Sequence, residues 1–415
     1  LMKLNHIYIY KSIACGVLLA MTATSCDLDY NPVDTYSDVT EGVNKTDEKP
    51  IFNSVQDVET SMVTLHKKFR DQQEHWYVDK LLIGDAHSDN AYAGTTGAEV
   101  VPYETNSIEG SNSVLKRDWD RFLGDIAVAN RIIVGCDQLK ALSESERGKY
   151  QSQAKIFRAM VMFDMVRLWG NFPVITTVGG DITEDNVEEM YPTYFPPQNT
   201  AEEAYAQIEK DLTEAVENPN TPTNDTSDKS ILTKSVARAM LAKVYAEKPL
   251  RDYAKVIKYA DELAADGFDL VEDFSDLWAY DTEKKDCRVR NTKEAILEAH
   301  FPPGSGNWCT WMFGRNLSNW DESFTWAKWI TPSRDLIRLY EEQGDTKRYN
   351  ESVVWYDCGW SNYYPADHYA FMYKCRSAFN SIIYLRYADI LLLKAEAKIC
   401  LLYTSDAADD RISVD

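Results

Sequence analysis

Apolar residues recur every three or four positions along much of the chain, the spacing that turns one side of an α-helix toward a core. Alanines gather at contact positions in the later stretches, where they let helix backbones approach closely, and Pro or Gly stands at the turns. The repeated unit of a helix, a short turn and a second helix predicts an array of helical pairs. This is a mainly α fold similar to atypical tetratricopeptide repeats. The pattern predicts helices at residues 53–70, 119–139, 144–169, 200–217, 232–249 and 253–268.

One stretch breaks the amphipathic pattern. In IFRAMVMFDMVRLWGNFP, residues 156–173, apolar side chains occupy almost every side of the predicted helix. A helix of this kind must be covered by neighbours on several sides, since any exposed side would carry apolar surface. The few charged residues do not fall on one stripe. Asp164 and Arg167 are three residues apart, so we expect them to pair with each other.

The ends of this apolar helix are marked by local sequence. Ser143 and Glu146 fit a capping box, in which a side chain and a backbone N–H satisfy each other at the helix start. Gly170 stands where a helix ends in a backbone conformation that other residues adopt poorly, and Pro173 prevents continuation. The helix is therefore expected to run from Glu144 to Trp169.

The pattern changes after residue 267. AILEAHF at residues 295–301 alternates weakly and predicts a strand, and a short helix is expected after Pro332. The polar region 84–111 is long for a connection, and loops of that length are often functional. One domain is expected over residues 51–398, with helical repeats mainly at 51–267 and 381–398 and a loop-rich aromatic subregion with minor β structure at 268–380.

The N-terminus is typical of a targeting segment. Two lysines precede a short apolar run, SIACGVLLAMTA, which is too short to span a bilayer as a stable helix. Small residues then stand directly before Cys26, the arrangement of a lipoprotein cleavage site. Residues 1–25 are therefore predicted to be a signal peptide, Cys26 the lipidated first residue of the mature chain, and residues 26–50 a leader. The alternative is ordinary cleavage after Ala23 or Ser25, with Cys26 incidental.

The last residues do not match what precedes them. The string LLYTSDAADD within residues 399–415 resembles a translated sequencing adapter. We therefore expect residues 399–415 to be an artefactual tail.

Composition limits the candidate functions. The formal net charge of −22 argues against nucleic acid, whose phosphates need a basic surface. Six cysteines lie beyond Cys26, far apart and without CxxC spacing, which argues against a zinc site and against a disulfide framework. No metal and no cofactor is predicted.

Tryptophan is unevenly distributed. Seven of the 11 tryptophans lie between Trp308 and Trp360. Trp308, Trp311 and Trp320 stand in the Gly-, Asn- and Ser-rich stretch PPGSGNWCTWMFGRNLSNWDES, which argues against a purely structural core. Flat aromatic rings stack on the apolar C–H face of a sugar, so these three are candidate ligand contacts. Trp326 and Trp329, next to the following helix, are expected to pack under the loops.

Seven pieces of the chain form an ordered set: the lipoprotein start, AKIFRAMVMFDMVRLWGNFPVI, TAEEAYAQIEKDLTEAV, LTKSVARAMLAKVYAE, KEAILEAHF, SRDLIRLYEEQGDTKRY and IIYLRYADILLLKAEA. Together, and in this order, they resemble the SusD/RagB family of surface lipoproteins. They span nearly all of residues 26–398.

The resemblance implies a scaffold of four helical pairs and a more variable loop-rich part that holds the ligand. It implies a non-catalytic protein, lipid-anchored in the outer membrane and facing outward. Such a protein binds glycan oligomers or other nutrients and passes them to a TonB-dependent, SusC-like transporter. In the family the region after residue 84 often contributes to the ligand site, which makes Asp89, Asn90 and Tyr92 further candidate contacts.

Two rival functions stay open. A lipid-anchored glycoside hydrolase needs two acids about 5 to 9.5 Å apart, and Glu298 is the best single candidate, but the chain supplies no specific motif. A helical-repeat adaptor would have no small ligand. Ser152 and Lys155 have the SxxK spacing of acyl-transfer enzymes but lie within a predicted helix. His87 with Asp89 and Asn90 could ligate a metal, although hydrogen bonds within a polar turn explain the same residues.

Overall fold

The computed structural model describes residues 50–94, 97, 99–180, 182, 186–281, 283, 286–301, 306–309, 329–359, 361–374 and 376–412. The chain from Ile51 onward forms one compact unit. Within the described residues, no helix combines the length and the apolar character needed to cross a bilayer.

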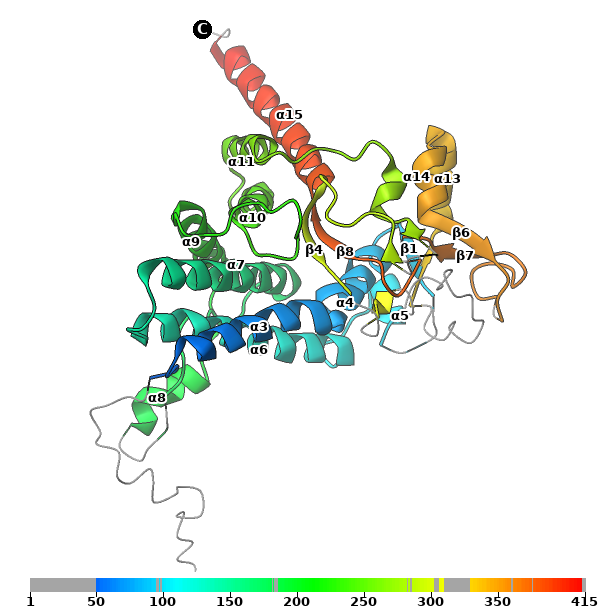
Figure 1. The fold of residues 1–415 in the computed structure, drawn as a ribbon. Helices are drawn as coiled ribbons and strands as arrows, with labels where there is room; N and C mark the ends of the chain where they lie inside the picture. Colours follow the sequence, from blue (N-terminus) through cyan, green and yellow to red (C-terminus); the bar gives the residue numbers. More distant parts are fainter. Residues whose placement is uncertain are drawn as a thin grey trace, which may run out of the picture. The chain divides into compact units, whose positions relative to one another are not determined.

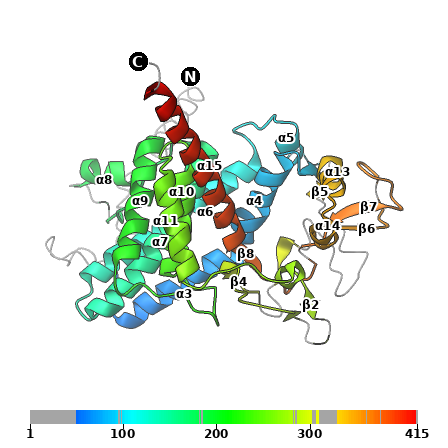
Figure 2. The ribbon, with the colours of Figure 1, turned by 90° about the horizontal axis from the view of Figure 1, so that it is seen from above.

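Long helices packed side by side make up most of this unit (Figures 1 and 2). Each helix contacts the one before it and the one after it in the series, which confirms the predicted mainly α, repeat-like scaffold. The series is α3 (Val55–Asp71), α6 (Ser113–Gln138), α7 (Glu144–Trp169), α9 (Ala201–Glu217), α10 (Lys234–Ala246), α11 (Tyr253–Ala265) and α15 (Tyr387–Ile412).

The apolar helix of the sequence is α7, and its predicted ends are confirmed. The Ser143 hydroxyl accepts a hydrogen bond from the Glu146 backbone N–H, and the Glu146 carboxylate accepts one from the Ser143 backbone, so the capping box is complete. Gly170 ends the helix with φ +71°, a value that favours glycine. Every side chain from Ile156 to Val166 is buried, because α7 contacts α3, α6, α9 and α10.

Charged residues inside α7 find partners on neighbouring helices. Arg158 donates two hydrogen bonds of 2.7 Å to the Asp211 carboxylate on α9 and a third of 2.7 Å to the Asn130 side-chain oxygen on α6. Arg158 is only 3% exposed and Asp211 only 1% exposed. This buried ion pair therefore joins three consecutive helices of the array.

The expected pairing of Asp164 with Arg167 is wrong. The Asp164 carboxylate lies 2.6 Å from the Lys80 ammonium and also accepts a hydrogen bond from the Tyr384 hydroxyl at 3.1 Å. Arg167 instead contacts Glu247 at 3.3 Å. Asp164 is 4% exposed, so it pairs with a cation that reaches it inside the packed structure, whereas Arg167 is half exposed and points outward.

The region expected as a loop, residues 84–111, contains short elements instead. A segment with local π-helical geometry leads into it, and its backbone groups are bonded within turns or to distant segments. The buried residues of this segment, among them Ala91, Ala93 and Tyr103, need such partners for their N–H and C=O groups, which explains the departure from a loop. The elements are π-helices Glu74–Val78 and Leu82–Ala86 around α4 (Asp79–Leu81), then β1 (Ala91–Ala93) and α5 (Val101–Glu104).

Four two-stranded antiparallel sheets occur in the described part of the chain, β1–β5, β2–β3, β4–β8 and β6–β7. The predicted strand in AILEAHF is confirmed as β4, and all five of its side chains are buried, which explains its weak alternation. The strands are β2 (Tyr280–Asp281), β3 (Asp286–Cys287), β4 (Ala295–Ala299), β5 (Ile330–Pro332), β6 (Val353–Tyr356), β7 (Tyr369–Met372) and β8 (Ile382–Arg386).

The loop-rich aromatic subregion has a small core of its own. Buried side chains from α13, β6, β7 and the segment between these strands pack together, separately from the main core of the helical array. The members are Ile337, Val353, Tyr364, Tyr369, Ala370 and Phe371. Further helical elements of the described residues are α8 (Val187–Tyr194), the 3-10 helix Phe274–Leu277, α13 (Arg334–Gln343), as predicted after Pro332, and α14 (Thr346–Ser352).

Candidate ligand-binding site

Two tyrosines from distant parts of the chain stack beside the small aromatic core. Tyr92 on β1 and Tyr363, in the segment between β6 and β7, have ring centroids 4.6 Å apart and planes within 6° of parallel. Both side chains are half-buried, so each keeps some exposed ring surface. Tyr364 lies next to them, with its ring centroid 6.5 Å from that of Tyr92.

Strand pairing and α13 position this tyrosine pair. Tyr92 is opposite Thr331 in the β1–β5 sheet, which leads directly into α13. Arg334, the first residue of α13, donates its backbone N–H to the Tyr92 hydroxyl at 3.1 Å. Its guanidinium donates to the Tyr363 backbone carbonyl and lies 4.7 Å from the centre of the Tyr364 ring. One arginine thus holds both members of the stack.

Glu104 fixes the other side of the pair. Its Oε2 accepts hydrogen bonds of 2.7 Å from the Tyr363 hydroxyl and from the Ala93 backbone N–H. Burial, and then the neighbouring Glu104 carboxylate, raise the pKa of Tyr363. Tyr363 therefore stays protonated and donates to Glu104. The ring is neutral and held in one orientation, a preorganised surface for a flat partner.

A second stacked pair extends the aromatic surface. Trp355 on β6 and His368 have ring centroids 4.3 Å apart and planes within 3° of parallel. The Trp355 indole N–H donates to the Tyr349 hydroxyl at 2.9 Å. Tyr364 packs edge-on against Trp355 at 5.2 Å and so links the two stacks. We call Tyr92, Tyr363, Tyr364, Trp355 and His368 the aromatic cluster.

Of the aromatic cluster, the sequence predicted Tyr92 as a ligand contact but none of the other four members. The tryptophans predicted from the sequence stand in a Gly- and Asn-rich stretch. In the aromatic cluster, by contrast, Trp355 stands on β6, and Tyr363, Tyr364 and His368 stand between β6 and β7. The adjacent tyrosines of SNYYPADHY were the available signal. The sequence alone could not assign Tyr363 as the stacking partner of Tyr92. Tyr363 is held near β1 by its hydrogen bond to Glu104, and these two residues are 259 positions apart in the chain.

Asp89 and Asn90 lie immediately before β1, and both side chains are exposed. Their backbone carbonyls accept hydrogen bonds from the Ser333 hydroxyl and the Ser333 N–H, respectively, the latter at 3.0 Å. Asn90 also donates its N–H to the Ser88 hydroxyl at 3.2 Å. The backbone thus ties the turn that precedes β1, the strand of Tyr92, to the start of α13. In the described ranges no cluster of three or more His, Cys, Asp or Glu residues has the arrangement of a metal site.

Trp308 lies in a different environment. It is half-buried and packs against the main core, and its backbone N–H donates to the Gln73 side-chain oxygen at 2.8 Å. The Gln73 amide in turn donates to the Gly306 carbonyl at 2.8 Å. Trp329 also packs partly buried against the main core, as expected. Trp311, Trp320, Trp326 and Cys26 lie outside the described residues. Of the predicted contacts that are described, Asp89, Asn90 and Tyr92 lie together at the start of β1, and Trp308 packs against the main core instead.

The residues considered for catalysis have structural partners. Glu298 is 1% exposed, and its carboxylate accepts from the Asn291 backbone N–H at 3.1 Å and lies 3.1 Å from the His300 ring nitrogen. The Ser152 hydroxyl donates to the Lys149 carbonyl at 3.1 Å. Lys155 pairs with Glu214 at 2.8 Å. Each group is thus already engaged in holding the fold.

Comparison with known proteins gives the family. The profile of a SusD-like family, described as "Starch-binding associating with outer membrane", matches residues 35–246, about half of the chain. The chain belongs to the SusD-like family. A SusD-like protein of Bacteroides ovatus is 25% identical over 309 residues, which are 71% of this chain and 50% of the relative. The chain thus spans about half the length of the curated relative it matches.

Solved structures share the fold. Surface glycan-binding protein A of Bacteroides uniformis superposes with a TM-score of 0.66 at 17% identity, covering 83% of this chain and 76% of that chain. A laminarin-binding SusD-like protein gives 0.64 at 18% identity, covering 83% and 80%. A SusD superfamily protein of Bacteroides thetaiotaomicron gives 0.65 at 19% identity, covering 82% and 76%. At these identities the likeness establishes the helical scaffold of the family and nothing finer.

Proposed function

We propose that this SusD-like protein binds oligosaccharide at the cell surface without cleaving it and delivers it to a TonB-dependent, SusC-like outer-membrane transporter. The description of the matching family supports starch-type ligands and association with the outer membrane. Two of the similar solved proteins are named as a surface glycan-binding protein and a laminarin-binding SusD-like protein. Family membership favours oligosaccharide over other nutrients, because those named ligands are all glycans.

The observation that carries the proposal is the stacked Tyr92–Tyr363 pair in the loop-rich aromatic subregion. A sugar ring presents an apolar C–H face and a rim of hydroxyls, so it suits flat aromatic rings with polar neighbours. The exposed side chains of Asp89, Asn90 and Asn362 stand on the segments that carry these tyrosines. Trp308, Trp311 and Trp320 remain proposed ligand contacts.

Replacing Tyr363 with alanine tests the site. We expect the dissociation constant for a bound oligosaccharide to rise about tenfold or more, since a lost stacking contact of ~1.4 kcal/mol corresponds to a factor of ten. Tyr363→Phe keeps the ring and should bind nearly as wild type. Tyr191→Ala removes an exposed tyrosine on α8 and is the matched control. Equal binding by wild type and Tyr363→Ala would place the ligand elsewhere.

The rival functions make different predictions for the same titration. A glycoside hydrolase would release new reducing ends from the oligosaccharide, whereas a capture protein returns it intact. An adaptor without a small ligand would give no saturable binding to any glycan. Binding without turnover supports capture alone.

The proposed anchor and partner have their own tests. Lipid attached at Cys26 would hold the protein on a membrane, since buried acyl chains drive attachment. Cys26→Ser should therefore move the protein from the membrane fraction to the soluble fraction. Copurification of the protein with a TonB-dependent transporter after mild detergent extraction of the membranes would support the delivery step. Purification of the extracted protein without any such transporter would count against the delivery step.

A further inference from the structure

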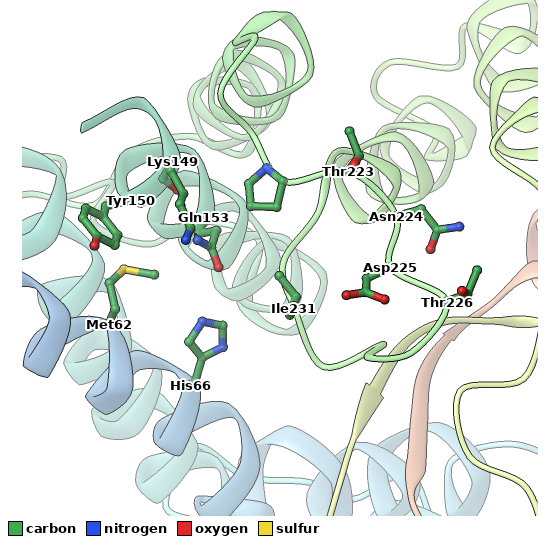
Figure 3. A pocket seen from close by; sticks show the side chains of 11 residues that line it. Met62, His66, Lys149, Tyr150, Gln153, Thr223, Asn224, Asp225, Thr226 and Ile231 are labelled. Atoms are coloured by element: carbon green, nitrogen blue, oxygen red, sulfur yellow. Dashed lines mark hydrogen bonds between the residues drawn. The ribbon is translucent and has the colours of Figure 1, made fainter. Parts of the chain in front are cut away.

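A cleft of about 650 Å³ lies on the helical array and shares no lining residue with the aromatic cluster (Figure 3). Helices α3 and α7 form one side, and the segment 218–233 between α9 and α10 forms the other. The volume falls in the range of about 300 to 1,000 Å³ typical of small-molecule sites. The lining side chains are Met62, His66, Lys149, Tyr150, Gln153, Pro222, Thr223, Asn224, Asp225, Thr226 and Ile231.

The segment wall of the cleft is fixed in place before any ligand arrives. The Asn218 amide donates to the Gly148 carbonyl at 3.0 Å, and the Thr221 hydroxyl donates to the Ala215 carbonyl at 2.6 Å. The Asn224 amide donates to the Asp266 carbonyl at 3.2 Å, and the Asn224 side-chain oxygen accepts a hydrogen bond from the Lys229 ammonium. A wall held by hydrogen bonds to α7, α9 and the end of α11 loses little entropy when a ligand binds.

Polar groups reach the floor of the cleft from the helices. Gln153 is 4% exposed, and its amide donates to the Lys149 carbonyl at 3.2 Å. Burial lowers the pKa of His66, although Gln153 and Asp228 oppose the shift. His66 is therefore neutral at pH 7 and offers ring nitrogens as one donor and one acceptor.

The charges on the two sides of the cleft balance. Lys149 belongs to the helical side, and Asp225 belongs to the segment side, where its Oδ1 already accepts from the Ser227 N–H and hydroxyl at 2.7 and 2.6 Å. Apolar surface comes from Met62, Pro222 and Ile231 beside the half-buried Tyr150 ring. The cleft thus offers hydroxyl and amide partners and apolar faces, with no excess of either charge.

From this lining we propose that the cleft is a second binding site, for one or two units of a neutral carbohydrate. Neutral sugars need hydrogen-bond donors and acceptors together with a small apolar face, which the cleft provides. An anionic ligand would face the like charge of Asp225, and a cationic ligand would face the like charge of Lys149. The inference shares only the ligand class with the proposed function. It stands on different residues, so each site can fail without the other.

Saturation-transfer NMR and calorimetry with a panel of neutral mono- and disaccharides at millimolar concentration test the second site. The full chain carrying Tyr92→Ala and Tyr363→Ala serves as background, so that any remaining binding arises outside the aromatic cluster. We expect at least one sugar to bind this background. Adding His66→Phe or the exposed Lys149→Ala should weaken that binding at least tenfold.

Several outcomes overturn the second site. If the background variant binds no sugar that the wild type binds, sugar binds only at the aromatic cluster, and the proposed function stands alone. Binding that is unchanged by both His66→Phe and Lys149→Ala also excludes the cleft. If His66→Phe fails to fold, Lys149→Ala decides, because its side chain is exposed. Binding of free amino acids, but of no sugar, to the background variant would assign the cleft to a zwitterionic ligand.

Discussion

Removing the Asp211 carboxylate should destabilise the helical array strongly. Arg158 is only 3% exposed. Asp211→Ala removes the carboxylate that faces its guanidinium, together with two hydrogen bonds of 2.7 Å. Breaking a buried pair by deleting one partner typically costs about 3 to 5 kcal/mol, because the remaining charge cannot be hydrated. The Asn130 contact remains and cannot neutralise the charge.

The same two helices provide the control. Lys155 on α7 pairs with Glu214 on α9 at 2.8 Å, but the two side chains are 23% and 40% exposed. Exposed ion pairs contribute about 0 to 1 kcal/mol, so Glu214→Ala should cost no more than that. A double variant, Arg158→Met with Asp211→Leu, removes both charges and should recover most of the lost stability.

Urea unfolding followed by circular dichroism measures the difference. We expect Asp211→Ala to lower the midpoint several times more than Glu214→Ala, and the double variant to lie closer to wild type than Asp211→Ala does. Equal shifts for Asp211→Ala and Glu214→Ala would refute the argument that burial, rather than the ion pair itself, sets the cost.

Three further variants test packing and titration. A Cβ added at Gly135 would lie 2.4 Å from two ring carbons of the buried Phe52, so Gly135→Ala should cost about 1 to 3 kcal/mol and lower the melting temperature. In the same helix a Cβ at Gly124 meets nothing closer than 3.9 Å, so Gly124→Ala should stabilise by about 0.5 to 1 kcal/mol; the same sign for both would refute the packing account. Burial, and then the Asp79 carboxylate, raise the pKa of Asp118 to about 9 from 3.8. The folded state therefore binds an extra proton between these values, and stability falls as the pH rises through that window. Asp118→Asn should flatten this fall in urea midpoints between pH 5 and pH 8, and an unchanged slope would contradict it.

Local signals made the helical part of the fold predictable. The capping boxes Ser143–Glu146 and Thr200–Glu203 define the starts of α7 and α9, because both partners of each box lie within three residues. The apolar run of α7 predicted neighbours on several sides, since burial of a helix surface follows from composition alone. Such features need no knowledge of distant residues.

Contacts between distant residues were beyond the sequence. Asp164 pairs with Lys80 rather than with Arg167, because a buried carboxylate takes the cation that the fold brings to it. The aromatic cluster joins Tyr92 to Tyr363 across most of the chain, and the β1–β5 pairing, Arg334 and Glu104 align them. A single sequence holds the residue types of the site but not their register.

We propose that this SusD-like protein captures oligosaccharide on its aromatic cluster without chemical change. Calorimetric titration of wild type and the Tyr92→Ala, Tyr363→Ala double variant with soluble glucan oligosaccharides, followed by chromatography of the recovered ligand, tests it most directly. We expect saturable binding by wild type, at least tenfold weaker binding by the variant, and oligosaccharides recovered at their original length. Shortened oligosaccharides, or equal affinity in wild type and variant, would contradict it.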